Sequence, residues 1–344
     1  MNPTKYLIAA LLLTVGAVWA GDLEDGKKAL LKRDYAAAFA IFKSLSDQGD
    51  VNAPFSIGEM YDRGQGVTQS AADGFKWYLL AAERGNMPAL NYVADSYFGS
   101  SVVKKDRAEG IRWYRLGVAK GDSESLNALG RIYRYGQGVP KDATEGVRLI
   151  RLAADKGDIT ALNTLGSLYG LGLGGLTKDD KESARLYALA AAQGNSHAQF
   201  MLGYMYERGE GVQKSFDEAL RLYRLSAEQG NSYSQLRIGG MYEAGQGVPK
   251  DYRTAFKWYQ LSATKGEFEG NEAQTKLGQM YLNGRGVLQD YRKAHMWFNL
   301  AATWGDIEAV NDRNAVAKLM TNQQIAEAQK LARECLAQKY KYCD

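Results

Sequence analysis

A glycine recurs along this chain at an almost constant interval. It stands at Gly49, Gly85, Gly121, Gly157, Gly194, Gly230, Gly266 and Gly305, with gaps of 36, 36, 36, 37, 36, 36 and 39 residues. Self-similarity at a period of roughly 20–50 residues is typical of solenoids, in which each unit buries its apolar face by stacking on its neighbours. The repeat therefore favours one elongated domain over the two globular domains that a length of 344 residues would otherwise suggest.

Each repeat is predicted to be two helices joined by a glycine turn. In residues 196–231 the apolar or small side chains fall on one face of a first helix, and a second set falls on one face of a second helix. The first set is Ala198, Leu202, Gly203 and Tyr206, and the second is Phe216, Ala219, Leu222, Tyr223 and Ala227. The turn Gly209-Glu210-Gly211 separates them, and Gly230 ends the second helix, as glycine does where the chain turns left-handed.

The repeated pattern is A-x-x-x-L-G-x-x-Y-x-x-G-x-G-V followed by W-Y-x-x-A-A-x-x-G. Four tryptophans share one place in the second helix, where we expect them in the core between repeats: Trp77, Trp113, Trp258 and Trp297. The pattern resembles the Sel-1-like repeat family, relatives of the tetratricopeptide repeats, in seven units over residues 52–306. The resemblance implies an all-α, right-handed superhelical α/α solenoid. We expect residues 21–51 to form an N-terminal capping helix pair and residues 307–344 to form C-terminal capping helices.

The first twenty residues are predicted to be a cleaved signal peptide. Lys5 is followed by an apolar run up to Trp19, which is shorter than the ~20 residues that a membrane span needs. Cleavage after Ala20 would deliver a mature protein without a membrane span to the periplasm or the medium. The formal net charge of +4 is small and dispersed, so we expect no binding to nucleic acid.

The two cysteines, Cys335 and Cys343, are predicted to form a disulfide, because an exported protein meets an oxidising compartment. On a continuous helix their separation of eight residues spans about 12 Å, whereas bridged Cα atoms lie within ~7 Å. The helix is therefore expected to end near Gln338 or Lys339. Two free thiols on a frayed tail are the alternative.

Signs of catalysis, metal binding or cofactor binding are missing from the pattern. The Gly-x-Gly turns lack the preceding strand and the Lys-Ser/Thr of a phosphate-binding loop. His197 and His295 stand far apart and have no cysteine or serine partner at motif spacing, so we expect them to be solvated or packed between helices. Two cysteines without a nearby histidine make a zinc site improbable.

One polar pattern could mark a binding site. Asn91, Asn127 and Asn163 occupy the same first-helix position in three consecutive units. The resemblance to tetratricopeptide units implies that this position faces a concave groove, where amides pair with an extended peptide. The groove would also contain Phe55, Phe200, Glu59, Asp95, Arg131, Arg134 and Tyr204. A ladder of asparagines that links repeat to repeat is the alternative, and the two remain open.

The expected function is protein binding by a monomeric, non-enzymatic scaffold or adaptor, because an α-solenoid offers an extended surface and no catalytic cleft. The family resemblance implies an envelope component, a host protein or an effector toxin as the partner. Some related exported proteins are immunity factors against periplasm-directed effectors such as phospholipases. The alternative is a cell-wall-related binding protein or a weak β-lactamase-like enzyme, although the K-T-G motif and the cysteine pairs of those relatives are missing.

Overall fold

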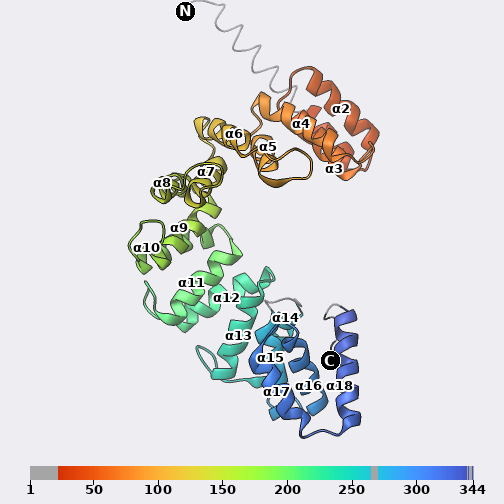
Figure 1. Ribbon diagram of the computed structural model, residues 1–344, viewed down its shortest axis with the longest axis vertical. Coiled ribbons are helices and arrows are strands. Elements are labelled where there is room, and N and C mark those ends of the chain that lie inside the picture. The colour runs from red at the N-terminus through yellow and green to blue at the C-terminus, as the bar shows by residue number, and fades with distance from the viewer. Residues whose placement is uncertain (1–21, 265–269, 339, 341–342, 344) are drawn as a thin grey trace, which may run out of the picture. The chain divides into compact units, whose positions relative to one another are not determined.

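The computed structural model describes residues 22–264, 270–338, 340 and 343, which form helices and turns and no strand (Figure 1). The prediction of an all-α solenoid of helix pairs is confirmed. The predicted signal peptide, residues 1–20, lies outside the described residues, as does Gly266. The other seven recurring glycines all have a positive φ, as expected of residues that turn the chain after a helix.

Seven helix pairs follow a shorter N-terminal pair made of residues 22–31 and α2 (Tyr35–Asp47). We call the first helix of each later pair the A helix and the second the B helix. The A helices are α3 (Ala53–Arg63), α5 (Met87–Gly99), α7 (Ser123–Tyr135), α9 (Ile159–Leu171), α11 (Ser196–Arg208), α13 (Ser232–Ala244) and α15 (Asn271–Asn283). The B helices are α4 (Ala71–Arg84), α6 (Arg107–Ala119), α8 (Ala143–Asp155), α10 (Asp180–Ala192), α12 (Phe216–Glu228), α14 (Tyr252–Ala263) and α16 (Tyr291–Ala302).

Local sequence signals set these boundaries. Every B helix follows a serine or aspartate whose side chain accepts a hydrogen bond from a backbone N–H of the first turn, which satisfies an otherwise unpaired donor. The turn between an A helix and its B helix needs its second glycine because there is no room for a side chain. A Cβ at Gly211 would overlap the backbone of Asp180, in the first turn of the preceding B helix. The Gly-x-Gly motif therefore joins two helices and also lets the turn pack closely on the previous repeat.

The chain divides into two compact units, residues 1–161 and 162–344. In the first unit, helices that are adjacent in sequence pack against each other from α2 to α8, and the core between α2 and α3 includes Phe42, Ile57 and Met60. In the second unit the same holds from α10 to α16. Trp113 and Trp297 are buried, and the half-buried Trp77 and Trp258 pack against core clusters, so the tryptophans belong to the core as predicted.

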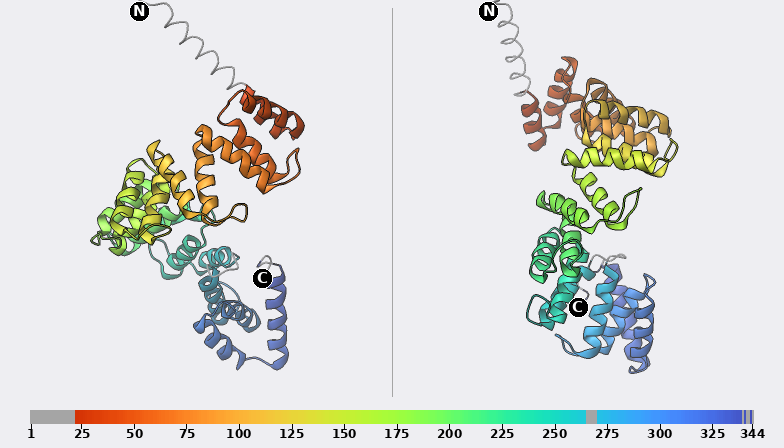
Figure 2. Two further views of the ribbon diagram at one scale, coloured as in Figure 1. Left: turned by 45° about the horizontal axis from the view of Figure 1, so that its top comes forward. Right: turned by 90° about the vertical axis from the view of Figure 1, so that its left-hand side faces the viewer.

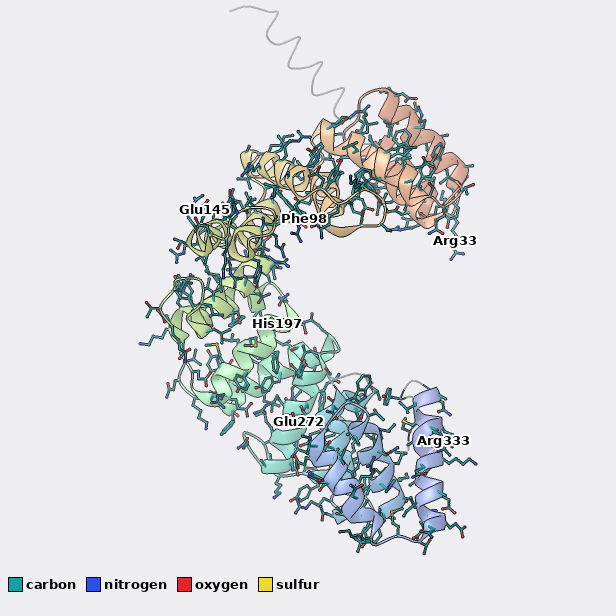
Figure 3. The ribbon with its side chains drawn as sticks, viewed as in Figure 1. Arg33, Phe98, Glu145, His197, Glu272 and Arg333 are labelled. Atoms are coloured by element: carbon teal, nitrogen blue, oxygen red, sulfur yellow. A yellow bond between two sulfur atoms is a disulfide. The ribbon has the colours of Figure 1, made fainter. Side chains whose placement is uncertain are left out.

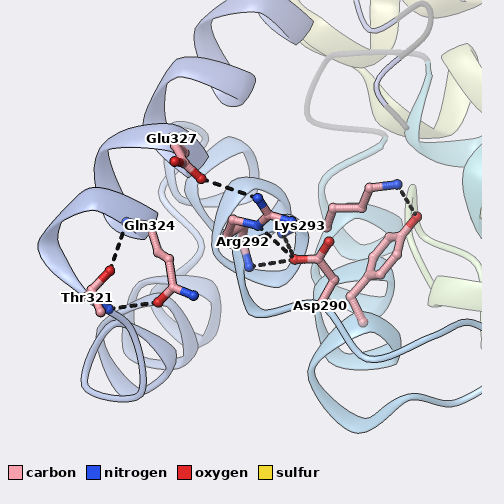
Figure 4. A network of polar contacts seen from close by, with 7 residues as sticks. Asp290, Arg292, Lys293, Thr321, Gln324 and Glu327 are labelled. Atoms are coloured by element: carbon pink, nitrogen blue, oxygen red, sulfur yellow. Dashed lines mark hydrogen bonds and ion pairs between the residues drawn. The ribbon is translucent and has the colours of Figure 1, made fainter.

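The second unit ends in α17 (Ile307–Ala317) and α18 (Asn322–Ala337), and both pack on α16. Figures 1 and 2 show α18, in dark blue, beside α16. Thr321 and Gln324 form a capping box at the start of α18, and Arg292 of α16 donates to Glu327 of α18 at 3.2 Å (Figure 4). Two further helices of the same chain thus cover α16, the last B helix.

Cys335 and Cys343 form a disulfide, with their Cα atoms 5.0 Å apart. Helix α18 ends at Ala337 with Gln338 as its C-cap, where the spacing of the two cysteines required an end. The chain then turns at Tyr340, which has a φ of 60° and donates its backbone N–H to the carbonyl of Cys335. This fold-back brings Cys343 within reach of the helix.

Candidate functional site

Asn91 lies between two repeats and is 4% exposed. Its Nδ2 donates to Oδ2 of Asp122 at 3.0 Å and to Oε2 of Glu124 at 2.9 Å, and its Oδ1 accepts from Oγ of Ser125 at 2.7 Å. Burial, with nearby carboxylates including Asp122, raises the pKa of Glu124, while the bond from Asn91 acts in the opposite direction. The amide of Asn91 is therefore fully engaged with the next A helix.

Asn163 makes a similar link, since its Nδ2 donates to Oδ1 of Asn195 at 3.1 Å. Asn127 is also 4% exposed. The bonds of Asn91 and Asn163 favour the asparagine ladder, whereas Oδ1 of Asn127 is buried without a hydrogen-bond partner and supports neither alternative. A role of Asn91, Asn127 and Asn163 in partner binding stays a prediction.

The aromatic residues that were predicted in the groove lie on A helices and pack on neighbouring rings. Phe55 is half-buried, with its ring centroid 5.3 Å from that of Tyr78. Phe200 lies 5.9 Å from Tyr223 and 5.8 Å from Tyr233. Tyr204 lies beneath two guanidinium groups, those of Arg208 and Arg237.

The charged residues that were predicted in the concave groove differ in the contacts that they make within the chain. Glu59 forms a surface ion pair with Arg63 on its own helix, and the guanidinium of Arg134 lies over the ring of Tyr135. Asp95 accepts a hydrogen bond from the hydroxyl of Tyr114. Arg131 is exposed on α7. The structure thus brings these residues to the A helices, and most of them contact other groups of the chain.

A repeated tyrosine–carboxylate pair escaped the sequence analysis. Buried B-helix tyrosines donate their hydroxyls to a carboxylate sixteen residues earlier, on the A helix of the same repeat: Tyr78 to Asp62 at 2.8 Å, Tyr223 to Glu207 at 2.7 Å and Tyr259 to Glu243 at 2.6 Å. A buried hydroxyl needs such an acceptor. In two repeats the B-helix position of these tyrosines carries Ile150 or Phe298, which have no hydroxyl. The residues sixteen positions earlier are then Arg134 and Leu282, which are not acids. The spacing is only a partial signal, because Phe98 and Leu171 stand sixteen residues before the buried Tyr114 and Tyr187, and Tyr114 donates to Asp95 instead.

Burial, reinforced by the bond to the carboxylate, raises the pKa of each of these tyrosines far above its ordinary value. The phenols therefore stay neutral and act as donors. Each carboxylate keeps acceptor capacity beyond its tyrosine, because an ionised carboxylate has about four lone-pair sites. In the second unit, Glu207 and Glu243 place two such acids on neighbouring A helices.

A groove of about 270 Å³ opens on the A helices of the second unit. Its lining comes from α11, α13, α14 and α15 and the turn after α13: Glu207, Leu236, Arg237, Gly240, Met241, Glu243, Ala244, Gln246, Tyr259, Glu272 and Lys276. Glu272, labelled in Figure 3, is exposed at the start of α15. Gly240 occupies the position that carries Glu59, Asp95, Arg131, Tyr204 and Gln279 in other repeats. The groove therefore opens where this side chain is missing.

One wall of the groove holds an ion pair between repeats. Arg237 of α13 donates through Nε and Nη2 to the two carboxylate oxygens of Glu207 of α11, whose side chain is 11% exposed. Burial by itself would lower the pKa of Arg237, but the contact with Glu207 outweighs it and raises that pKa. Because Glu207 also accepts from Tyr223, its charge is committed within the protein. Among the charged groups of the groove, Glu243, Glu272 and Lys276 have the most capacity left to form hydrogen bonds or ion pairs with a ligand.

Two histidines and a Ser-x-x-Lys sequence are further candidates for chemistry in the described part of the chain. The described residues hold no group of three potential metal ligands, and none of their helices is long and apolar enough to cross a membrane. His197 is exposed near Tyr187 and His295 is buried in α16. We expected no S-x-x-K motif of serine β-lactamases, and this was wrong, because Ser101 and Lys104 have that spacing. Both residues are exposed in the loop between α5 and α6, and no hydrogen bond joins their side chains there.

The Sel1 repeat family model matches eight segments of the chain. They are residues 19–50, 55–86, 88–122, 123–158, 159–195, 196–231, 232–267 and 271–306. The first segment coincides with the predicted N-terminal cap, so the family model counts one repeat more than the seven of the sequence analysis.

Two solved structures, the first two below, share this fold. A protective antigen of uropathogenic Escherichia coli with an SLR fold is 27% identical, with a TM-score of 0.55 over 94% of this chain and 85% of that one. A Sel1 repeat protein from Oxalobacter formigenes is 31% identical, with a TM-score of 0.64 over 70% of this chain and 98% of that one. An immunity protein from Pseudomonas aeruginosa is 20% identical, with a TM-score of 0.40 over 76% and 83%, respectively. No curated protein matches the sequence.

Proposed function

We propose, from the premise that the chain belongs to the Sel1 repeat family, that it is an exported, non-enzymatic scaffold that binds another protein through its A helices. The observation that carries this proposal is the groove at Gly240, where several charged or polar side chains surround a position without a side chain. Stacked helix pairs present such surfaces as extended binding faces. Peptide segments and loops of a partner are the ligands that these faces suit.

Export is the second part of the proposal. It is supported by the apolar run before Ala20 and by the disulfide between Cys335 and Cys343, which persists in oxidising compartments. The mature protein is expected to begin at Gly21 in the periplasm or the medium. N-terminal sequencing of protein from fractionated cells tests this. Soluble cytoplasmic protein that retains Met1 would contradict export.

The partner would be an envelope component, a host protein or an effector toxin. Within this range, a finer role is that of an immunity protein against a periplasm-directed effector such as a phospholipase. The support for this role is the family resemblance. Its test is survival of cells that produce such an effector encoded beside this gene, with and without the chain. Equal killing in both strains would remove the immunity role and leave the scaffold untouched.

The binding face is tested by a matched pair of variants. Gly240→Gln places a polar side chain in the groove, whereas Leu225→Gln places the same side chain at an exposed position of B helix α12. Proteins cross-linked to the full chain in the periplasm are quantified for the wild type and both variants. We expect Gly240→Gln to lose the captured partner and Leu225→Gln to retain it. Undiminished capture by Gly240→Gln would contradict binding at the groove that carries this proposal. β-Lactam hydrolysis by the purified chain would contradict a non-enzymatic role.

A further inference from the structure

We propose that the groove at Gly240 is a subsite for a basic side chain, lysine or arginine, of the bound partner. This inference rests on the proposed binding role of the A helices and adds the chemistry of what they recognise. It follows from three properties of the groove: its space, its free charges and its floor.

The space is set by two adjacent glycines of α13 with different surroundings. A Cβ at Gly239 would lie 2.6 Å from the ring of Tyr259, so this glycine is required for packing. A Cβ at Gly240 would meet only Oη of Tyr259, at 3.8 Å, so packing does not require a glycine there. The resulting groove of about 270 Å³ lies just below the ~300–1,000 Å³ of pockets that hold drug-sized ligands. It therefore suits one or two side chains.

The free charge of the groove is negative. Three carboxylates line it, but Glu207 is neutralised by Arg237 and bonded to Tyr223. Glu243 accepts one hydrogen bond, from Tyr259, and Glu272 is exposed on α15. These two acids outnumber the remaining base, Lys276. Because Arg237 already donates to both oxygens of Glu207, the groove lacks a free guanidinium that could receive an anion.

What we call the floor of the groove is the part of its lining made of apolar side chains of α13. Leu236 is 7% exposed and Met241 is 1% exposed, and Ala244 lies beside them. Lysine and arginine bury aliphatic stems on such surfaces while their charged ends stay near water and carboxylates. A neutral polar side chain would leave one of the two acids without a counter-charge, because Lys276 is the one base of the lining besides Arg237. A basic side chain satisfies both parts of the site.

A thiol at the centre of the groove tests the charge preference directly. Gly240→Cys in the full mature chain is incubated with cystamine or with 3,3′-dithiodipropionic acid, at one fixed concentration of 2-mercaptoethanol. The fraction of each mixed disulfide is measured by intact mass. We expect the cationic adduct to be favoured about three- to tenfold, as for exposed pairs with one or two carboxylates. Ser167→Cys, at the same position of α9, measures the preference outside the groove.

A triple variant that combines Gly240→Cys with Glu243→Gln and Glu272→Gln should lose the preference for the cationic adduct. Glutamine retains the hydrogen bond from Tyr259, and a thermal melt verifies that this variant is folded. Equal capture of the two probes by Gly240→Cys, or a preference that survives in the glutamine background, would overturn the inference. If Gly240→Gln still abolishes partner capture in that case, the proposed function stands and only the basic subsite fails. If partner capture is also unaffected, both fail.

Discussion

Neighbouring residues of one helix can have opposite sensitivities to the same change, as Gly239 and Gly240 show. Gly240→Ala should raise stability by up to about 1 kcal/mol, because alanine favours the helix and its Cβ fits. Gly239→Ala should lower stability by about 1–3 kcal/mol, because its Cβ overlaps the ring of Tyr259. Urea melts of both variants compare the effects. Shifts of the same sign would contradict the packing at this site.

A buried histidine makes stability depend on pH. His295 is 3% exposed, and burial, with a smaller effect of Arg313, lowers its pKa below 6.5. As the pH falls below about 6.5, the unfolded chain binds a proton here that the folded chain does not, so stability falls. His295→Leu should therefore lose less stability than the wild type between pH 8 and pH 5.5. Melting temperatures at both pH values measure this, and the pH 8 difference isolates the packing effect. An unchanged pH dependence would show that His295 does not contribute.

At the scale of elements, the side chains between successive A helices fix how one repeat stacks on the next. Asn91→Ala removes two donors from Asp122 and Glu124 and an acceptor from Ser125. It should cost about 1–3 kcal/mol, because it leaves buried polar groups unpaired. Asn163→Ala removes the bond to Asn195 and should cost less, about 0.5–1.5 kcal/mol. Thermal melts, run beside partner capture, separate the two hypotheses. If Asn91→Ala melts like the wild type but loses the partner, binding of a peptide by these asparagines would be favoured over the ladder.

At the scale of the whole molecule, a repeat stack distributes its stability among neighbouring units, so a local change has a local effect. The disulfide closes a short loop between α18 and the tail, and a bond of this kind contributes about 2–3 kcal/mol. Cys335→Ser combined with Cys343→Ser should therefore speed hydrogen exchange in α18 and leave exchange in α11 to α13 unchanged. Faster exchange throughout residues 162–338 would show that the C-terminal cap controls the stability of the entire unit.

The sequence by itself determined the helix pairs, their turns and the end of α18. These features depend on signals within one repeat: apolar spacing, capping side chains, glycines and the reach of a disulfide. The sequence left the asparagines undecided between ladder and groove, and it missed the carboxylate partners of Tyr78, Tyr223 and Tyr259. Only the tertiary structure decided which side chains of neighbouring helices meet, and therefore which charges are neutralised and which stay free. The groove at Gly240 depends on that choice, because it opens where three repeats stack around a position without a side chain.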